Sequence, residues 1–407
     1  MTSSSQSRSA KHDVSTLIEN WGERLVWVSH DIHDHPELNY AEHHAHDLLV
    51  DTLRDMIPGV AVTPGAYGIP TAFEAVFGDA GPEVLVLLEY DALPGIGHGC
   101  GHNVIAAAGL GAGLAAGTLA QDLGGRVRLL GTPAEEGGGG KIALARRGAF
   151  ATGEAALMIH PADADLLRMS SIAIHTMDVT YEGRAAHAAA APWEGRNALD
   201  AAVLGYMNVA ALRQHIRPDE RIHGIFTEAG EKPNIVPRRA AATWYVRSAT
   251  LASLQPLKER VTACLDGAAR ACGCSMTTAW DDHAYADVRD NAALVSAYAR
   301  NMAALGRPPA DPEASGRRVV GSTDMGNVSY LMPSIHPMIK IAPDGVPIHT
   351  EEFARHAGSE AGDEASIVGA KAMARTIVDL WGNTALLDEV RREFSAVTSS
   401  VDVMARP

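Results

Sequence analysis

Along the first 160 residues, apolar positions change from a helical spacing to short unbroken runs. The helical spacing predicts helices over 15–31 and 41–57. Unbroken runs, as expected of strands buried on both faces, occupy 84–88, 126–130 and 155–159. Between these runs we expect an Ala/Gly-rich helix over 104–120 and a further helix over 139–148. Because strand and helix alternate, the pattern predicts an α/β domain with a mostly parallel sheet.

A second order of elements follows between about 169 and 284. Strands are expected over 171–181, 222–228, 240–246 and 275–280, with helices over 197–215 and 251–271. This β-α-β-β-α-β order predicts an α+β sandwich with helices on one face of an antiparallel sheet. Helices expected over 291–305 and 360–381 then return to the pattern of the α/β domain. We therefore interpret 169–284 as a domain inserted into an α/β domain made of 1–168 and 285–407.

Length and charge narrow the possible functions. The 407 residues exceed the ~250–300 at which a single core usually stops growing, so two domains are expected. A net charge of −15 argues against nucleic acid as a partner. The polar first ten residues do not resemble a secretory signal, and 104–120 falls short of a membrane span, so we expect a cytoplasmic protein without membrane contact. Four cysteines are too few for a disulfide-stapled fold of this size.

Polar residues capable of binding a metal follow each of the three apolar runs. Cys100 and His102 follow the first run, Glu135 and Glu136 the second, and His160 the third. In parallel sheets the carboxyl ends of the strands share one edge, where ligands bind. Thiolate, imidazole and carboxylate together suit borderline divalent ions. The sequence therefore predicts a metal site in which one glutamate binds metal and its neighbour acts as a base.

Four motifs together resemble a known metallopeptidase family. They are Asp91-Ala-Leu-Pro, Cys100-Gly-His102-Asn103, Pro133-Ala-Glu135-Glu136-Gly137-Gly and His349-Thr-Glu-Glu-Phe. This family includes aminoacylases, carboxypeptidase G and hippurate hydrolase. The chain is most similar to its amidohydrolase branch, with aminobenzoyl-glutamate hydrolases and short-dipeptide hydrolases. The resemblance extends from about Trp27 to Phe353, including the inserted domain.

The resemblance implies a catalytic α/β domain with two metal ions and an inserted domain that serves as lid and dimerisation surface. Its implied metal ligands are Cys100 (bridging the ions), His102, Glu136, His160 and His349. Glu135 matches the general base, and Asp91 matches a carboxylate that supports a ligand. His336 is a rival for the last ligand, but the Thr and Phe that follow His349 fit the family pattern. Glu89 is not counted as a ligand, because this chain follows the cysteine branch.

Further residues match substrate-facing positions of the family. In the inserted domain, His187 resembles a histidine that reaches a neighbouring subunit's active site and stabilises the oxyanion. Asn234 and Arg247 resemble a pair suited to holding a carboxylate. Ser322 and Thr323 lie in a loop, 321–326, that resembles another part of the substrate pocket.

Three other features receive ordinary structural interpretations. Six histidines between His30 and His46 coincide with a helix-turn of the family and are not interpreted as a metal-storage tract. The glycine-rich segment 137–141 is not a phosphate loop, because Ile142 stands where Ser or Thr is required. Cys272 and Cys274 are expected to be packing residues.

We therefore expect a homodimeric hydrolase that uses two divalent ions, zinc or manganese with cobalt as a further candidate, to cleave an amide bond. Its substrate would be a small N-acyl amino acid, an aminobenzoyl-glutamate-like conjugate or a dipeptide. An alternative is hydrolysis of another C–N bond, in an aryl amine or amidine, which would release ammonia. A more distant alternative is a non-catalytic metal-binding protein, whose mark would be loss of Glu135 or of a ligand; none is lost here.

Overall fold

The computed structural model describes residues 4–316, 320–397 and 402–404. The chain divides into two compact units. The first is formed from segments 1–170 and 288–400, and the second from 171–287 together with the described residues 402–404. The inserted segment thus starts and ends within about three residues of the expected 169–284.

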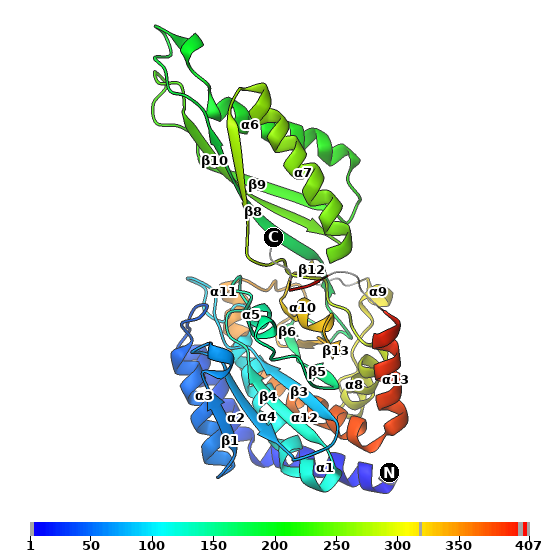
Figure 1. The fold of residues 1–407 in the computed structure, drawn as a ribbon. Helices are drawn as coiled ribbons and strands as arrows, with labels where there is room; N and C mark the ends of the chain where they lie inside the picture. The colour runs from blue at the N-terminus through cyan, green and yellow to red at the C-terminus, as the bar shows by residue number, and fades with distance from the viewer. Residues whose placement is uncertain (1–3, 317–319, 398–401, 405–407) are drawn as a thin grey trace. The chain divides into compact units, whose positions relative to one another are not determined.

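The first unit contains a six-stranded sheet whose central strands are parallel (Figure 1). In sheet order the strands are β1 (Ala61–Pro64), β2 (Phe73–Phe77), β4 (Arg126–Gly131), β3 (Glu83–Leu88), β5 (Ala155–Leu157) and β13 (Ser334–Ile335). Neighbours from β4 to β13 are parallel, whereas β1 and β2 pair antiparallel, as do β2 and β4. This confirms the α/β class with a parallel-rich sheet. The antiparallel strands β1 and β2 were not expected from the apolar pattern.

The third apolar run forms a shorter strand than predicted, and a second strand follows it. The expected strand over 155–159 ends at Leu157, and the chain then enters β6 (His160–Ala162). β6 pairs in parallel with β14 (Met338–Lys340) in a separate two-stranded sheet. His160 therefore begins β6, with two residues between it and the end of β5. The remaining short strands are β7 (Ser170–Ser171) and β12 (Val320–Gly321).

Helix α4 (His102–Leu123) packs directly on the sheet through a row of glycines. A side chain at Gly113 would overlap Leu129 of β4, and one at Gly117 would overlap Phe77 of β2. The Ala/Gly-rich composition therefore permits close contact between helix and strands. By length and composition α4 could cross a membrane, which corrects the expectation that 104–120 is too short to do so. However, 83% of its most apolar 18-residue window is buried inside the fold. That burial is typical of a core helix.

Helices α12 (Glu360–Gly382) and α2 (Gly22–Asp34) pack on α4, and α1 (Ser4–Asn20) packs on α12. The single helix expected over 15–31 is wrong, because Trp21 leaves helical geometry (φ −94°, ψ 1°) just before Gly22. Three other helices of this unit lie within the predicted ranges: α3 (His43–Met56), α5 (Gly140–Arg146) and α8 (Ala292–Ala304). The sequence did not predict α9 (Pro312–Ser315), α10 (Met325–Ser329), α11 (Glu351–Ala357) or α13 (Thr384–Ala396).

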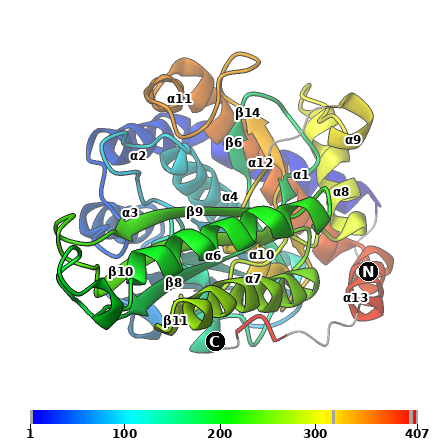
Figure 2. The ribbon, with the colours of Figure 1, turned by 90° about the horizontal axis from the view of Figure 1, so that it is seen from above.

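The second unit is an antiparallel four-stranded sheet covered by two helices, as predicted. Its strand order is β11 (Ser275–Trp280), β8 (Ala173–Glu182), β10 (Arg239–Ser248) and β9 (Arg221–Glu228). Figure 2 shows α6 (Ala198–Leu212) and α7 (Leu251–Ala271) side by side over these strands. Alternate residues of β8 and β10 face the helices and are buried, among them Trp244 at 1% exposure. A separate apolar core therefore holds this unit together.

Candidate metal centre

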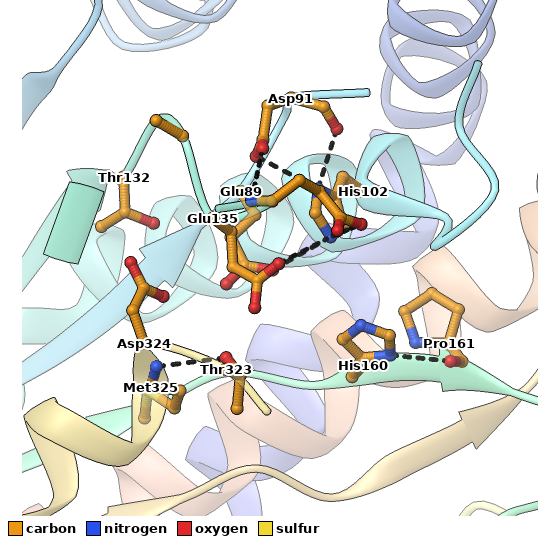
Figure 3. Close-up of polar contacts among 12 residues, drawn as sticks. Glu89, Asp91, His102, Thr132, Glu135, His160, Pro161, Thr323, Asp324 and Met325 are labelled. Carbon is orange, nitrogen blue, oxygen red and sulfur yellow. Dashed lines mark hydrogen bonds and ion pairs between the residues drawn. The ribbon is translucent and has the colours of Figure 1, made fainter. Parts of the chain in front are cut away.

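The donor residues predicted from the sequence converge in the first unit. One donor atom from each of Cys100, His102 and His160 lies within 4.8 Å of the other two, and the same holds for Cys100, Glu136 and His349. A third such group is His102, Glu135 and Glu136. Strands β4, β3 and β5 are adjacent and parallel, so the segments that follow them meet at one edge of the sheet. Figure 3 shows His102, Glu135 and His160 gathered there.

Asp91 holds the His102 ring in one orientation. His102 Nδ1 lies 2.8 Å from the Asp91 carbonyl oxygen and 3.2 Å from Asp91 Oδ1. A neutral ring that donates from Nδ1 keeps a lone pair on Nε2, the arrangement common in metal-bound histidines. Asp91 Oδ2 also accepts a hydrogen bond from the Glu136 backbone N–H at 2.9 Å. Asp91 therefore supports two predicted ligands at once.

His160 and Cys100 are buried in the same place. His160 Nδ1 donates to the carbonyl oxygen of Pro161 at 2.8 Å, which again leaves Nε2 for a ligand. Burial lowers the pKa of His160 to about 4, against the opposing effect of Glu89, so the ring is neutral at pH 7. Burial likewise raises the pKa of the Cys100 thiol. The Cys100 residue is only 5% exposed.

The glutamate pair lies on a strained loop after β4. Ala134 has φ 58°, in the left-handed region that non-glycine residues seldom adopt. Its N–H donates to Glu42 Oε1 at 2.8 Å, and its carbonyl accepts from the Gly140 N–H. Burial, followed by the charges of Glu89 and Glu136, raises the pKa of Glu135 well above its ordinary value. A carboxyl group with a raised pKa is a stronger base than an exposed glutamate.

His349 comes from a distant segment and also has a left-handed backbone, with φ 65°. Its N–H donates to the carbonyl of Gly99 at 2.9 Å, and its Nε2 lies 3.6 Å from Glu136 Oε1. The rival residue, His336, is fully buried with its ring 5.4 Å from that of His160. His336 belongs to none of the candidate donor groups found among the described residues. Of these two histidines, His349 is therefore the one that lies in a candidate donor group among the described residues.

Unpaired buried atoms test whether a metal fits this site. Within the described part of the chain, His102 Nε2, Glu136 Oε1 and Glu89 Oε2 are buried without a hydrogen-bond partner. Buried polar atoms are normally paired, because leaving one unpaired costs about 1–3 kcal/mol. A divalent cation would satisfy such lone pairs, and the thiol, imidazole and carboxylate donors match its preferences. The residues present thus fit a metal centre.

A buried lysine lies beside the centre and was not identified as a site residue from the sequence. Lys141 is 0% exposed, and its Nζ bonds to Glu89 and, at 2.6 Å, to Asp324 Oδ1. Burial alone would lower the pKa of Lys141, but Asp324 and Glu89 raise it above its ordinary value. Glu89, Glu135 and Asp324 form a further group of close carboxylates. Lys141 was considered only as part of a phosphate loop, although its apolar successors Ile-Ala-Leu indicated burial.

The predicted substrate residues fall in both units. In the first, Thr323 is buried and its Oγ1 accepts from the Met325 N–H at 3.1 Å, whereas Ser322 is half-buried. In the second, the backbones of His187 and Asn234 are adjacent, because Ala188 N–H donates to the Asn234 carbonyl at 3.0 Å. Arg247 is half-buried on β10.

The site combines buried thiol, imidazole and carboxylate donors with a neighbouring base, at the carboxyl edge of a parallel-rich sheet. This combination is typical of metal-dependent hydrolases. Comparison with known proteins specifies the family. The model of peptidase family M20/M25/M40 matches residues 79–379, and the chain belongs to this family of metal-dependent hydrolytic enzymes. The family resemblance stated from the motifs is thereby confirmed.

Two relatives are similar over nearly their whole length. The chain is 41% identical over 397 residues to the Xaa-Arg dipeptidase of Mus musculus, covering 94% of this chain and 92% of the relative. It is 28% identical over 459 residues to a p-aminobenzoyl-glutamate hydrolase polypeptide of Escherichia coli K12, covering 95% of each.

Two solved structures share the fold. An aminobenzoyl-glutamate utilization protein from Klebsiella pneumoniae superimposes with a TM-score of 0.72 at 20% identity, over 91% of this chain and 99% of the other. The Bacillus subtilis YxeP protein, a dinuclear metal binding peptidase of the M20 family, gives 0.69 at 17% identity, over 89% and 99%. At these identities the likeness establishes the fold.

Proposed function

We propose that this protein is a dinuclear metal-dependent dipeptidase that cleaves the amide bond of a small substrate. One observation carries the proposal: the two donor groups Cys100/His102/His160 and Cys100/Glu136/His349 share the Cys100 thiol. A shared thiolate between two three-donor groups is the arrangement expected of two neighbouring ions. The B. subtilis structural neighbour is itself a dinuclear metal binding peptidase. Zinc, manganese or cobalt would suit these donors.

The positions of the side chains support a catalytic role for each of them. When bound, the ions would polarise the substrate carbonyl and lower the pKa of a water molecule. Glu135, beside the donors and with a raised pKa, accepts a proton from that water and later delivers it to the leaving amine. Asp91 keeps His102 oriented throughout. Both products, an amine and a carboxylate, then leave.

His187 is proposed to donate a hydrogen bond to the developing oxyanion. Its Nδ1 accepts from the N–H groups of Ala189 (3.3 Å) and Ala190 (3.1 Å). A neutral imidazole that accepts at Nδ1 carries its proton on Nε2, and this exposed side chain therefore offers an N–H donor. Such a donor is what oxyanion stabilisation requires.

The preferred substrate class is a dipeptide with a basic C-terminal residue. The full-length similarity to a protein named Xaa-Arg dipeptidase supports this choice. A net charge of −15 also favours the approach of a cationic substrate. The aminobenzoyl-glutamate hydrolase relative makes an N-acyl glutamate the competing substrate.

A substrate panel tests the proposal. Protein reconstituted with Zn²⁺, Mn²⁺ or Co²⁺ is assayed on Ala-Arg, Ala-Lys, Ala-Glu, aminobenzoyl-glutamate and N-acetylalanine, with free amino acids and ammonia measured separately. We expect the highest kcat/KM on the basic dipeptides, without ammonia. Glu135→Gln should retain its metal and lose at least ~100-fold in kcat, whereas the exposed Glu259→Gln on α7 should be unaffected. Release of ammonia, or full activity of Glu135→Gln, would contradict the mechanism.

We further propose a homodimer formed through the second unit. Apolar residues are exposed on α6 (Val203, Leu204, Met207) and on β9 (Ile225, Phe226), the latter an edge strand. An exposed apolar patch next to an unpaired strand edge is typical of a subunit interface. Ile225, at 68% exposure, is the most exposed of these residues. Sedimentation equilibrium should give a dimer for wild type and a shift towards monomer for Ile225→Asp.

Mixing two inactive variants tests whether His187 acts across the dimer. A Glu135→Gln subunit keeps His187, and a His187→Ala subunit keeps Glu135, so mixed dimers contain one complete composite site. Random pairing makes about half of the dimers mixed, and activity should recover to roughly a quarter of wild type. No recovery would mean that His187 serves its own subunit. Full activity of His187→Ala alone would exclude the oxyanion role.

A further inference from the structure

We propose a second, separate metal site at the surface of the first unit, formed by Asp31, His35 and His44. One donor atom from each of these three side chains lies within 4.8 Å of the other two. The site belongs to the histidine-rich segment that the motif comparison interpreted as a structural helix-turn, and it shares no residue with the catalytic donors.

Two helix ends fix the three donors. Asp31 lies in the last turn of α2, His35 directly follows that helix, and His44 is the second residue of α3. His44 Nε2 contacts Asp31 Oδ1, and His35 Nδ1 lies 3.5 Å from the same oxygen. The two imidazole rings have their centroids 4.4 Å apart. One oxygen of the Asp31 carboxylate is thus approached by two imidazoles, one from the residue that follows α2 and the other from α3.

Backbone contacts hold these side chains in position before any ion arrives. His35 Nδ1 lies 2.8 Å from the Asp31 carbonyl oxygen, and a neutral ring that donates there keeps a lone pair on Nε2 for an ion. Glu37 binds the first turn of α3, where its carboxylate accepts from the N–H of His44 and of Ala45, both at 3.0 Å. Because less ordering is needed on binding, such preorganisation strengthens a metal site.

The donor types select the class of ion. Two imidazoles and one carboxylate suit borderline first-row divalent ions such as Zn²⁺, Co²⁺, Ni²⁺ or Cu²⁺, whereas Ca²⁺ and Mg²⁺ prefer oxygen donors. The side chains of His35 and His44 are 57% and 43% exposed, so an ion can enter from solvent and keep water at its remaining positions.

The segment between the two histidines supports the catalytic loop. Asn39 Nδ2 donates to the Glu136 carbonyl at 2.5 Å, and the Tyr40 hydroxyl donates to the Gly138 carbonyl at 2.8 Å. Glu42 accepts from the Ala134 N–H at 2.8 Å. An ion that joins His35 to His44 would clamp both ends of this segment. The surface site is therefore placed to stiffen the loop that carries Glu135 and Glu136.

Zinc titration of the full-length protein tests the site, after the catalytic centre has been loaded and excess metal removed. Wild type should bind one further equivalent of Zn²⁺ by calorimetry, with a rise in Tm and slower hydrogen exchange in 36–42. His35→Ala and His44→Gln should weaken this event at least ~10-fold, whereas His43→Ala, an exposed histidine one residue away, should not. Cys100→Ser should instead lose metal from the catalytic centre and keep the additional equivalent, so the two sites can be distinguished.

Two results would overturn the proposal. The first is equal zinc stoichiometry and affinity in wild type, His35→Ala and His44→Gln. The second is loss of the additional equivalent in Cys100→Ser but not in His44→Gln, which would assign that ion to the catalytic centre.

Discussion

Replacing Lys141 with methionine removes a buried cation from two buried carboxylates, and the structure sets the size of the effect. The side chains of Lys141, Glu89 and Asp324 are all 0% exposed. Removing one partner of a buried ion pair typically costs about 3–5 kcal/mol, because the remaining charge stays desolvated. At roughly 2–4 °C per kcal/mol for a large domain, Tm should fall by about 6–20 °C.

The loss should depend on pH in a defined direction. Burial raises the pKa of Asp324 to about 6 although Lys141 opposes this, so removing the lysine raises it further. A carboxyl group whose pKa is higher in the folded than in the unfolded state stabilises the fold at low pH and loses this contribution as pH rises through the folded pKa. The difference between wild type and Lys141→Met should therefore be larger at pH 8 than at pH 5.

Urea unfolding at both pH values measures this difference. Lys340→Met is the matched control, because its ion pair with Asp344 is exposed (43% and 55%) and should contribute at most about 1 kcal/mol. The double variant Lys141→Met/Asp324→Asn should recover part of the loss by removing one unpaired charge. A loss below about 1 kcal/mol at pH 8, or one that does not shrink at pH 5, would refute the reasoning.

Two further predictions concern metal affinity and acid stability. Asp91→Asn should weaken metal binding about 10–100-fold, because it disturbs the orientation of His102, whereas the exposed Asp122→Asn should not; a chelator competition assay measures both. In the second unit, burial, with Lys258 and His283 nearby, lowers the pKa of His175 to about 4. Because the unfolded chain takes up a proton at this histidine at higher pH than the folded chain, wild type should lose up to about 3 kcal/mol of stability between pH 6.5 and pH 4. His175→Gln should lack this part of the acid dependence in thermal unfolding, and identical pH profiles would contradict the assignment.

The predicted donors lie close together in the structure because motif and topology agree. Cys100, His102 and Glu136 lie in the segments that follow the adjacent parallel strands β3 and β4, and parallel strands place such segments together. His349, more than 200 residues further along the chain, could be joined to them only through the family resemblance. Local pattern alone did not distinguish it from His336, whose buried ring lies near that of His160, whereas the His349 side chain is 52% exposed.

The errors have local physical causes. The apolar run 155–159 gives no sign of where pairing changes, so the end of β5 at Leu157 depends on tertiary contacts with β13 and β14. The helix break at Trp21 was hidden because apolar spacing continues across it. Strands β1 and β2 are only four and five residues long, and alternation over so few residues is a weak signal.

Support of the catalytic loop is the part that no local pattern encodes. Ala134 and His349 both hold left-handed backbone conformations, each costing about 1–3 kcal/mol for a non-glycine residue. Their N–H groups are fixed by Glu42 and by the Gly99 carbonyl, partners that are 92 and 250 residues away in the chain. Strain persists only where the surrounding structure over-determines it. The positions of Glu135, Glu136 and His349 are therefore set by the folded first unit as a whole, and the segment 37–42 contributes to chemistry without supplying any catalytic donor.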